Sequence, residues 1–239
     1  MYGYYKSPLT PLRISKECIQ LSVEKEGKNL HYIRKCLDKS IEKILLSKDC
    51  GIIINPIEPL NTPKYITPYL LIEFEKAVFV EPKGTVNIFL TFPIEIGVFI
   101  YGRKGYDILD IFTLAKNKFT LYGDPRNGIV CKYYKSDIYT SIPNEKDPMI
   151  EGIMRLKLIN STENWAEINK AVFDAREMKV YFDENLVSTK ANMKLLSLKS
   201  AETEFVSSGI KKGMKSSIEV LHPGRLPVTT KKYLMEDGL

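Results

Sequence analysis

Histidine is scarce in this sequence, which limits the chemistry that its sites can perform. The 239 residues include two histidines, His31 and His222, in different halves of the chain. A histidine-based metal site or a Ser-His-Asp triad would have to be built entirely by tertiary contact. We therefore predict no metal site and no cofactor.

Cysteine is also sparse and follows no pattern. Cys18, Cys36, Cys50 and Cys131 lie far apart and form no C-x-x-C pair of the kind that binds zinc or carries redox chemistry. Because free cysteine is among the most buried residue types, we expect these four to be small apolar core residues. The alternative is a disulfide between Cys36 and Cys50, if the source is a hyperthermophile, in which intracellular disulfides occur.

Long hydrophobic runs are missing. No stretch reaches the roughly 18 uninterrupted apolar residues that a membrane-spanning helix needs. The first eleven residues, MYGYYKSPLTP, lack the basic start and apolar run of a secretory signal. We therefore expect a protein without a transmembrane segment, located in the cytoplasm.

A complete phosphate-binding loop is missing as well. The segment GIKKGMKS (209–216) is similar to one, but three residues instead of four separate its glycines, and Met214 lies between Gly213 and Lys215. Backbone amides at this spacing would not surround a phosphate. We expect a basic turn there.

Strand signals dominate what is present. Apolar residues make up 44% of the chain and charged residues 27%, which is typical of folded proteins. Runs rich in β-branched and aromatic residues alternate with Pro, Gly and Asn turn formers. The first series of expected strands covers 19–23, 30–34, 41–47, 52–54, 69–75, 78–80, 86–92 and 94–100.

A second series follows a polar segment with two prolines, residues 142–148, which is typical of a domain boundary. Its expected strands cover 153–159, 165–173, 178–182, 193–198 and 217–221. Short, regularly spaced strands are typical of sandwiches. We predict an all-β protein of two tandem β-sandwich domains, immunoglobulin-like or jelly-roll-like, covering 1–145 and 146–239. Trp165 is expected to fill a core.

The most distinctive segment is YGDPRNG (122–128), a dense run of turn formers between two apolar runs. A carboxylate, a guanidinium and an amide there would converge on one ligand. The ligand-binding candidates are Tyr122, Asp124, Arg126, Asn127 and Glu95. The alternative is structural: Asp124 caps the turn, Asn127 and Gly128 take positive φ, and Arg126 pairs with Asp124 or Glu95.

Positive charge gathers at the C-terminal end. The formal net charge is +6, and residues 209–232 hold six basic residues against one acid, Glu219. The nucleic-acid-binding candidates are Lys211, Lys212, Lys215, Arg225, Lys231 and Lys232. A basic end of this kind neutralises phosphates or is simply solvated.

Several stretches together resemble a known but uncharacterised protein family. They are INPIEP (54–59), YLLIEF (69–74) through TFPIEIG (91–97), LYGDPRNG (121–128) with Cys131, and EGI (151–153) through VFD (172–174). The chain is similar in these stretches to an archaeal conserved family labelled domain of unknown function 432. The resemblance implies an archaeal, cytoplasmic origin and supplies no activity.

Three functions remain open. The favoured hypothesis is a non-enzymatic module that binds a protein partner or takes part in an assembly. The second is a nucleic-acid-binding protein that uses the basic end together with tyrosines. The third is a β-sandwich hydrolase or carbohydrate-active protein with Asp124, Arg126, Asn127 and Glu95 around a pocket. Glu73 and Glu75 alternate with apolar residues, as on a solvated face, and are less suited to acid–base work.

Overall fold

Strands account for nearly all of the regular structure in this protein. The structure, a computed structural model, describes residues 2–6, 12–16, 19–27, 29–36, 39–46, 50–64, 66–102, 105–144, 146–220 and 232–239. These residues contain one short 3-10 helix, η1 (Ala175–Glu177), and no α-helix. The expected all-β class is confirmed. Within the described residues no helix is long and apolar enough to cross a membrane.

The chain forms two compact units. Unit 1 comprises Met1–Asn55 and Gly97–Ile111, and unit 2 comprises Pro56–Ile96 and Phe112–Leu239. The chain passes from one unit to the other within three strands, β6 (Gly51–Ile57), β9 (Glu95–Gly102) and β10 (Gly105–Phe112).

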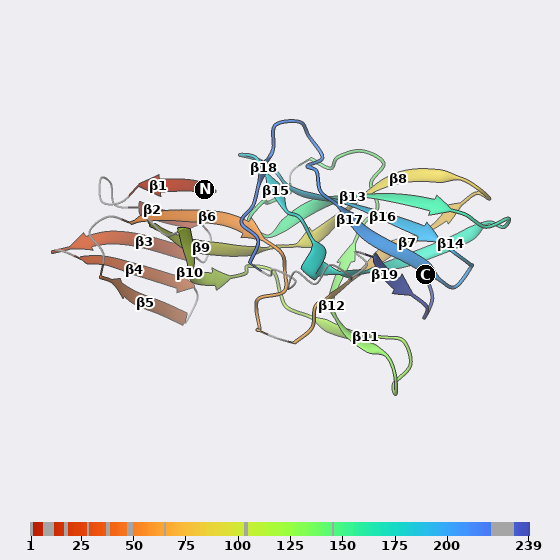
Figure 1. Cartoon of the computed structure of the whole chain (residues 1–239), viewed down its shortest axis with the longest axis horizontal. Coiled ribbons are helices and arrows are strands. Elements are labelled where there is room, and N and C mark those ends of the chain that lie inside the picture. The colour runs from red at the N-terminus through yellow and green to blue at the C-terminus, as the bar shows by residue number, and fades with distance from the viewer. Residues whose placement is uncertain are drawn as a thin grey trace. The chain divides into compact units, whose positions relative to one another are not determined.

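Unit 1 contains two four-stranded sheets, with strand orders β1-β6-β9-β10 and β2-β3-β4-β5 (Figure 1). The strands are β1 (Gly3–Lys6), β2 (Leu12–Lys16), β3 (Ile19–Glu26), β4 (Asn29–Cys36), β5 (Lys39–Leu45), β6 (Gly51–Ile57), β9 (Glu95–Gly102) and β10 (Gly105–Phe112). The expected hairpin between β3 and β4 is confirmed: Glu26 is paired with Asn29, and Gly27 takes φ +62 in the turn. Glycine adopts this left-handed conformation without steric cost.

A buried polar cluster joins the two sheets of unit 1. The Tyr32 hydroxyl donates to Asp110 Oδ2 at 2.7 Å, and Arg34 Nε donates to the same oxygen at 2.5 Å. Tyr32 and Arg34 belong to β4, and Asp110 belongs to β10. Burial and the Asp110 charge raise the pKa of the Tyr32 hydroxyl well above its usual range. The cluster satisfies charges that would otherwise be costly to bury.

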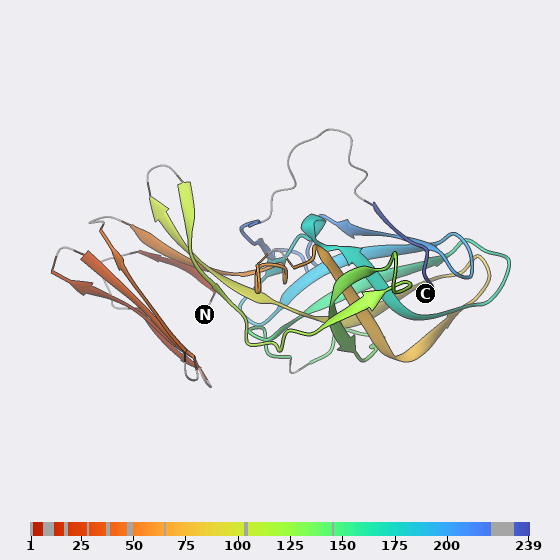
Figure 2. The same ribbon diagram turned by 90° about the horizontal axis from the view of Figure 1, so that it is seen from below.

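Unit 2 contains two further sheets, whose layers can be followed in Figure 2. One has the order β11-β12-β7-β14, and the other has β18-β15-β16-β13-β8, with β17 paired to β16 and β19 paired to β17. The strands are β7 (Tyr69–Val80), β8 (Thr85–Pro93), β11 (Phe119–Tyr122), β12 (Ile129–Ser136), β13 (Glu151–Asn160), β14 (Ala166–Asp174), β15 (Tyr181–Phe182), β16 (Val187–Leu195), β17 (Ala201–Val206), β18 (Lys215–Ser216) and β19 (Lys232–Met235).

The core of unit 2 follows the two-residue period of its strands. Ile88, Leu90 and Phe92 of β8 are 4%, 0% and 0% exposed, as their shared parity predicts, whereas Val86 at the strand's start is 36% exposed. Each buried side chain of this kind stabilises the fold by about 1.5 to 3 kcal/mol. Of the alternate residues, Asn87 is exposed and Phe89 is half-buried, as are their partners Lys157 and Arg155 on β13, whereas Thr91 and its partner Ile153 are buried.

Long-range pairing organises unit 2. The β13 strand pairs antiparallel with β8 and parallel with β16, and β7 pairs parallel with β12. The expected boundary between residues 145 and 146 therefore lies inside unit 2, with β8 and β13 from its two sides adjacent in one sheet. The division into domains 1–145 and 146–239 stays a prediction, and the compact units fall elsewhere.

Trp165 does not fill a core, contrary to expectation. Its side chain is 62% exposed, whereas Ala166 and Ile168 are fully buried. Successive residues of a strand point to opposite faces, so the tryptophan one position before Ala166 points outward. The alternation of side chains along the strand therefore determines that Trp165 faces solvent, whatever the size of its indole ring.

Two other expectations concern cysteine and histidine. Cys50 and Cys131 are buried as expected, and Cys36 is half-buried. His31 Nε2 lies 2.6 Å from Glu42 Oε1 on the neighbouring strand. Cys18 and His222 lie outside the described residues.

Candidate functional site

Tyr122, the first residue of the YGDPRNG segment, ties the chain's C-terminal end to β11. Its side chain is 2% exposed. The hydroxyl donates to the carbonyl oxygen of Gly238 at 3.0 Å and accepts from the amide of Asp237 at 3.1 Å. Burial raises the pKa of Tyr122 to about 12. We call residues 236–239 the C-terminal strap.

The backbone at Gly123 permits the strap to come close. Gly123 has φ +99, and a Cβ atom there would lie 2.6 Å from Asp237 Oδ2. Only glycine combines this conformation with such a close approach. The glycine therefore sets the position of the Asp237 carboxylate beside β11.

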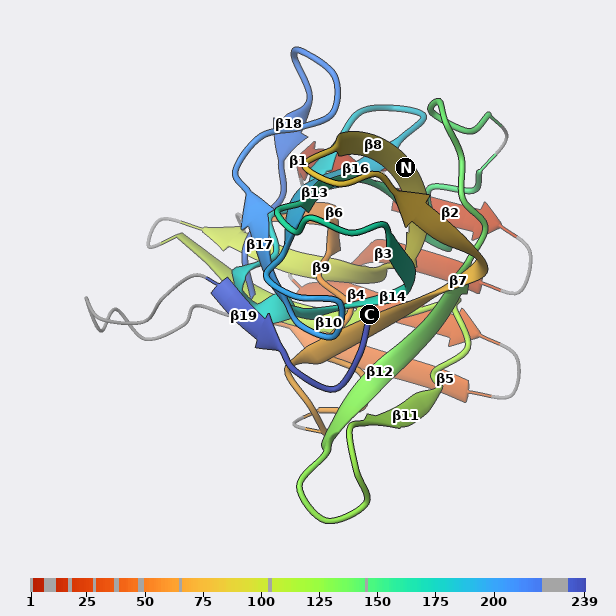
Figure 3. The same ribbon diagram turned by 90° about the vertical axis from the view of Figure 1, so that its right-hand side faces the viewer.

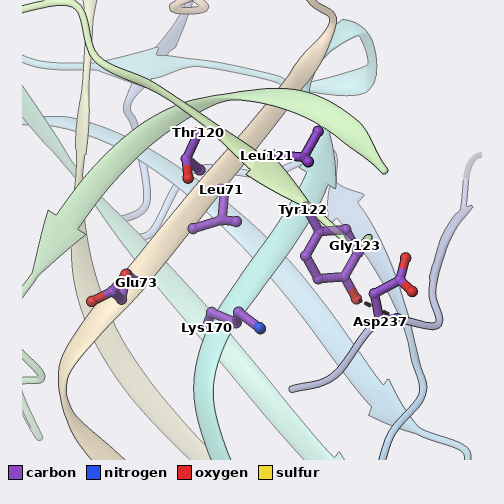
Figure 4. Close-up of a pocket in the computed structure, with 8 residues that line it drawn as sticks. All are labelled: Leu71, Glu73, Thr120, Leu121, Tyr122, Gly123, Lys170 and Asp237. Carbon is purple, nitrogen blue, oxygen red and sulfur yellow. Dashed lines mark hydrogen bonds between the residues drawn. The ribbon is translucent and has the colours of Figure 1, made fainter. Parts of the chain in front are cut away.

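A hollow of about 340 Å³ lies next to Tyr122 (Figure 4). It is lined by Leu71 and Glu73 of β7, Thr120, Leu121 and Tyr122 of β11, Gly123, Lys170 of β14, and Asp237 of the strap. Lys170 Nζ lies 5.5 Å from the centroid of the Tyr122 ring, within the range of a cation–π contact. Figure 4 shows Lys170 between Glu73 and Asp237, which point to opposite sides.

The charges that line the hollow do not balance. Glu73 and Asp237 contribute two negative charges against the single positive charge of Lys170. Within the described part of the chain, the Asp237 carboxylate has no hydrogen-bond or ion-pair partner. The lining of the hollow therefore carries a formal net charge of −1.

The β11 strand is the edge of its sheet. It pairs with β12 on one side, and no described strand pairs with its other side. The Tyr133 amide donates a hydrogen bond to the Lys118 carbonyl oxygen, so Lys118 and Tyr133 form a hydrogen-bonded pair. Hydrogen-bonded and non-hydrogen-bonded pairs alternate along an antiparallel ladder. By that alternation, the backbone groups of Phe119 and Leu121 point away from β12 toward the free edge.

The opposite face of the same edge is apolar. Phe119, Leu121 and Val130 are 38%, 43% and 47% exposed, and Leu121 lies directly opposite Val130. Figure 3 shows that the hairpin of β11 and β12 projects from unit 2. We call these three side chains the apolar patch. The free edge therefore lies between the polar hollow, which Leu121 also borders, and the side chains of the apolar patch.

The loop at the tip of this hairpin uses Asp124 for its own structure. Asp124 Oδ1 accepts from the amides of Arg126 and Asn127 at 2.7 and 3.1 Å, and these bonds lower the pKa of Asp124. The expected cap is confirmed. The expected positive φ at Asn127 and Gly128 is wrong, because the left-handed residue is Gly123. Gly128 is needed for space, since a Cβ there would lie 2.5 Å from the Asp124 carbonyl oxygen.

Glu95 lies in a separate environment from that loop. It is 0% exposed, and it accepts hydrogen bonds from the amides of Asn61 and Thr62, the Thr62 hydroxyl and Lys132 Nζ at 2.8, 3.1, 2.7 and 2.8 Å. Lys132 is 3% exposed. A carboxylate buried and bonded in this way fixes the loop at Asn61 and is closed to solvent. None of its hydrogen bonds reaches Asp124, Arg126 or Asn127.

The basic candidates are only partly described. Lys211, Lys212 and Lys215 are exposed, and Lys232 Nζ pairs with Glu202 at 3.0 Å. Arg225 and Lys231 lie outside the described residues. The segment GIKKGMKS contains a turn with Gly213 at φ +87, as a basic turn predicts.

Three residues of the site were missed by the sequence analysis. Lys170 and Asp237 line the hollow, and Lys132 neutralises Glu95. Lys132 lies within the apolar and aromatic run IVCKYY (129–134), which was an available signal for a buried lysine. No local pattern marks Lys170 or Asp237, because their proximity depends on the path of the C-terminal strap.

Comparison with known proteins identifies the family. The family model "Protein of unknown function (DUF432)" matches residues 1–236. The chain therefore belongs to this uncharacterised family, and the resemblance noted from its sequence is confirmed. No curated protein and no solved structure matches the chain.

Proposed function

We propose that this protein is a non-enzymatic binding module that adds an extended segment of a partner protein to strand β11. The observation that carries the proposal is the free edge of β11, with outward backbone groups at Phe119 and Leu121 between the hollow and the apolar patch. Strand addition takes its affinity from main-chain hydrogen bonds and its specificity from alternate side chains.

The two faces of the edge define the partner's sequence. Alternate residues of an added strand would face the apolar patch, where Leu121 and Val130 favour apolar side chains. The residues between them would face the hollow, where Asp237 and Glu73 favour Lys or Arg. The partner segment therefore alternates apolar and basic residues.

The geometry favours this function over the hydrolase. Asp124 is engaged by the amides of its own loop, and Glu95 is buried with Lys132. Neither carboxylate is placed to exchange a proton with a bound substrate. The cytoplasmic location, the archaeal source and nucleic-acid binding by the basic C-terminal end all stay predictions.

The test is a binding titration with two labelled peptides. The probes are fluorescein-labelled decapeptides of alternating valine and lysine, and of alternating valine and glutamate, and the readout is fluorescence anisotropy. We expect the lysine peptide to bind and the glutamate peptide to bind more weakly. Asp237→Asn is expected to reduce the difference between them, because it removes the unpartnered carboxylate of the hollow.

Leu121→Pro is the decisive variant. Proline removes the outward N–H of Leu121 without breaking a bond to β12, so the hairpin is retained while strand addition is blocked. The lost bond, worth about 1 kcal/mol, corresponds to about fivefold weaker binding, and the blocked ladder adds to this loss.

Leu198→Pro is the matched control. Leu198 is 50% exposed, and its amide makes no hydrogen bond to any described residue. We expect this variant to bind like the wild type. Equal binding by Leu121→Pro and the wild type, at matched thermal stability, would contradict strand addition.

A further inference from the structure

A row of side chains with nucleic-acid-binding chemistry crosses one face of the other sheet of unit 2, beside a row that is buried at Thr91, Ile153 and Ser188. Four residues lie directly opposite one another on neighbouring strands: Tyr139 opposite Phe89, Phe89 opposite Arg155, and Arg155 opposite Lys190. All four are half-buried, whereas Leu90 and its neighbours on the other face are core. We call these four residues the cation–aromatic row.

The two cations of the row have no acidic partner. Arg155 makes no hydrogen bond or ion pair with any described residue, and Lys190 Nζ donates to the neutral Ser208 hydroxyl at 3.1 Å. Burial and the charge of Arg155 lower the pKa of Lys190. Two like charges held side by side leave a site for an anion.

The acids of the same sheet are already engaged. Glu204 Oε1 accepts from Asn192 Nδ2 at 3.0 Å, and Glu202 pairs with Lys232 at 3.0 Å. The next position of β13 on the same face is Lys157, directly opposite Asn192. The basic side chains therefore continue from Arg155 to Lys157 along β13, and the Glu204 carboxylate lies beyond Asn192 at the far side of the sheet.

The exposed basic turn lies at one end of this surface. Ser208 contacts Lys190, and Met214 Sδ lies 3.2 Å from the Ser188 hydroxyl, two residues before Lys190 on β16. Lys211 and Lys212 lie between Ser208 and Met214 in the chain. The turn thus extends the path of positive charge that begins at Arg155.

We propose that this sheet face binds single-stranded nucleic acid, with Arg155 and Lys190 on phosphates and Phe89 and Tyr139 stacking on bases. Lys146 Nζ lies 5.6 Å from the centroid of the Tyr139 ring and also pairs with Glu151. Aromatic rings beside cations on an open sheet are the arrangement that single strands use, because unpaired bases stack on the rings. An anion that lacks bases would gain nothing from Phe89. The site shares no residue with the hollow or with β11.

The test measures fluorescence anisotropy of labelled dT12 and rU12 against the full chain over a range of salt concentrations. A 12-base-pair duplex and inorganic polyphosphate serve as competitors. We expect dT12 or rU12 to bind, and preference between them will distinguish DNA from RNA. The double variant Arg155→Gln/Lys190→Gln should bind more weakly and reduce the slope of log K against log salt by about 1.4, at about 0.7 per phosphate contact.

A second variant tests the aromatic side chains of the cation–aromatic row. Phe89→Leu keeps an apolar side chain of similar bulk and removes the stacking surface, so binding should weaken by at least about fivefold. Lys116→Gln/Lys199→Gln is the matched control, because it removes the same charge at two exposed lysines away from the row. It should leave the affinity close to that of the wild type.

Three results would overturn the proposal. The first is an equal loss of affinity in the control double variant, which would show that net charge alone drives binding. The second is unchanged binding by Phe89→Leu together with full competition by polyphosphate, which would make the face a general polyanion site. The third is tighter binding of the duplex than of either single strand.

Discussion

The buried pair of Glu95 and Lys132 supports the loop at Asn61 and Thr62, and its removal should be among the most destabilising changes in unit 2. The two side chains are 0% and 3% exposed, and Glu95 Oε1 accepts from Lys132 Nζ at 2.8 Å. In the Lys132→Met variant the carboxylate would remain buried without its counter-ion. In the Glu95→Leu variant the ammonium would be the uncompensated charge.

The expected loss in the free energy of unfolding depends on which buried groups remain unpaired in each variant. Breaking a buried ion pair by removing one partner costs about 3 to 5 kcal/mol, because the remaining charge is uncompensated. Lys132→Met should lie near 3 kcal/mol, since Glu95 keeps three hydrogen bonds from Asn61 and Thr62. Glu95→Leu should lie near or above 5 kcal/mol, since it also leaves those donors without their acceptor, at about 1 to 3 kcal/mol for each buried group.

The assay is urea unfolding of the wild type, both single variants and the double variant Glu95→Leu/Lys132→Met. The double variant leaves no uncompensated charge, so its loss of stability should be smaller than the sum of the two single losses by at least about 1 kcal/mol. Single-variant losses below about 1 kcal/mol, or additive losses, would refute the reasoning that the pair is buried and coupled.

Three further predictions follow from the hairpin of β11 and β12. Gly123→Ala should destabilise the protein by about 1 kcal/mol or more because of its positive φ and the nearby Asp237 carboxylate, measured by thermal unfolding. The pKa of Tyr122 in the folded protein, about 12, is above the ordinary value of 10.0. The contribution of Tyr122 to the free energy of unfolding is therefore fully present below pH 10 and is lost as the pH rises toward 12. Tyr122→Phe should be less stable than the wild type at pH 7 and should lose less stability between pH 10 and pH 12. Burial raises the pKa of the Cys131 thiol to about 12, so iodoacetamide at pH 8 should leave Cys131 unmodified in native protein and alkylate it in urea, as read by peptide mapping.

Local patterns in the sequence predicted much of the fold. The hairpin of β3 and β4, the long strands β7, β8, β13 and β14, and the cap at Asp124 all depend on residues close in the chain. Turn formers and a two-residue hydrophobic period are sufficient to indicate them. The family resemblance also followed from short stretches and is confirmed by the family model.

The remaining structure depends on contacts between distant residues. The parallel pairing of β13 with β16 and the placement of the C-terminal strap against Tyr122 involve no local signal. Short strands such as β11 and β17 were missed because four to six residues provide too little periodicity. The outward position of Trp165 depends on a one-residue shift in parity, which a β-propensity argument does not resolve.

The central claim, strand addition at β11, is tested most directly by hydrogen exchange at individual amides, measured by NMR with and without the valine–lysine decapeptide. The account predicts slower exchange at the amides of Phe119 and Leu121, which point to the free edge, and little change at Thr120, whose N–H is directed toward β12. Binding of the peptide without protection of Phe119 and Leu121 would contradict it.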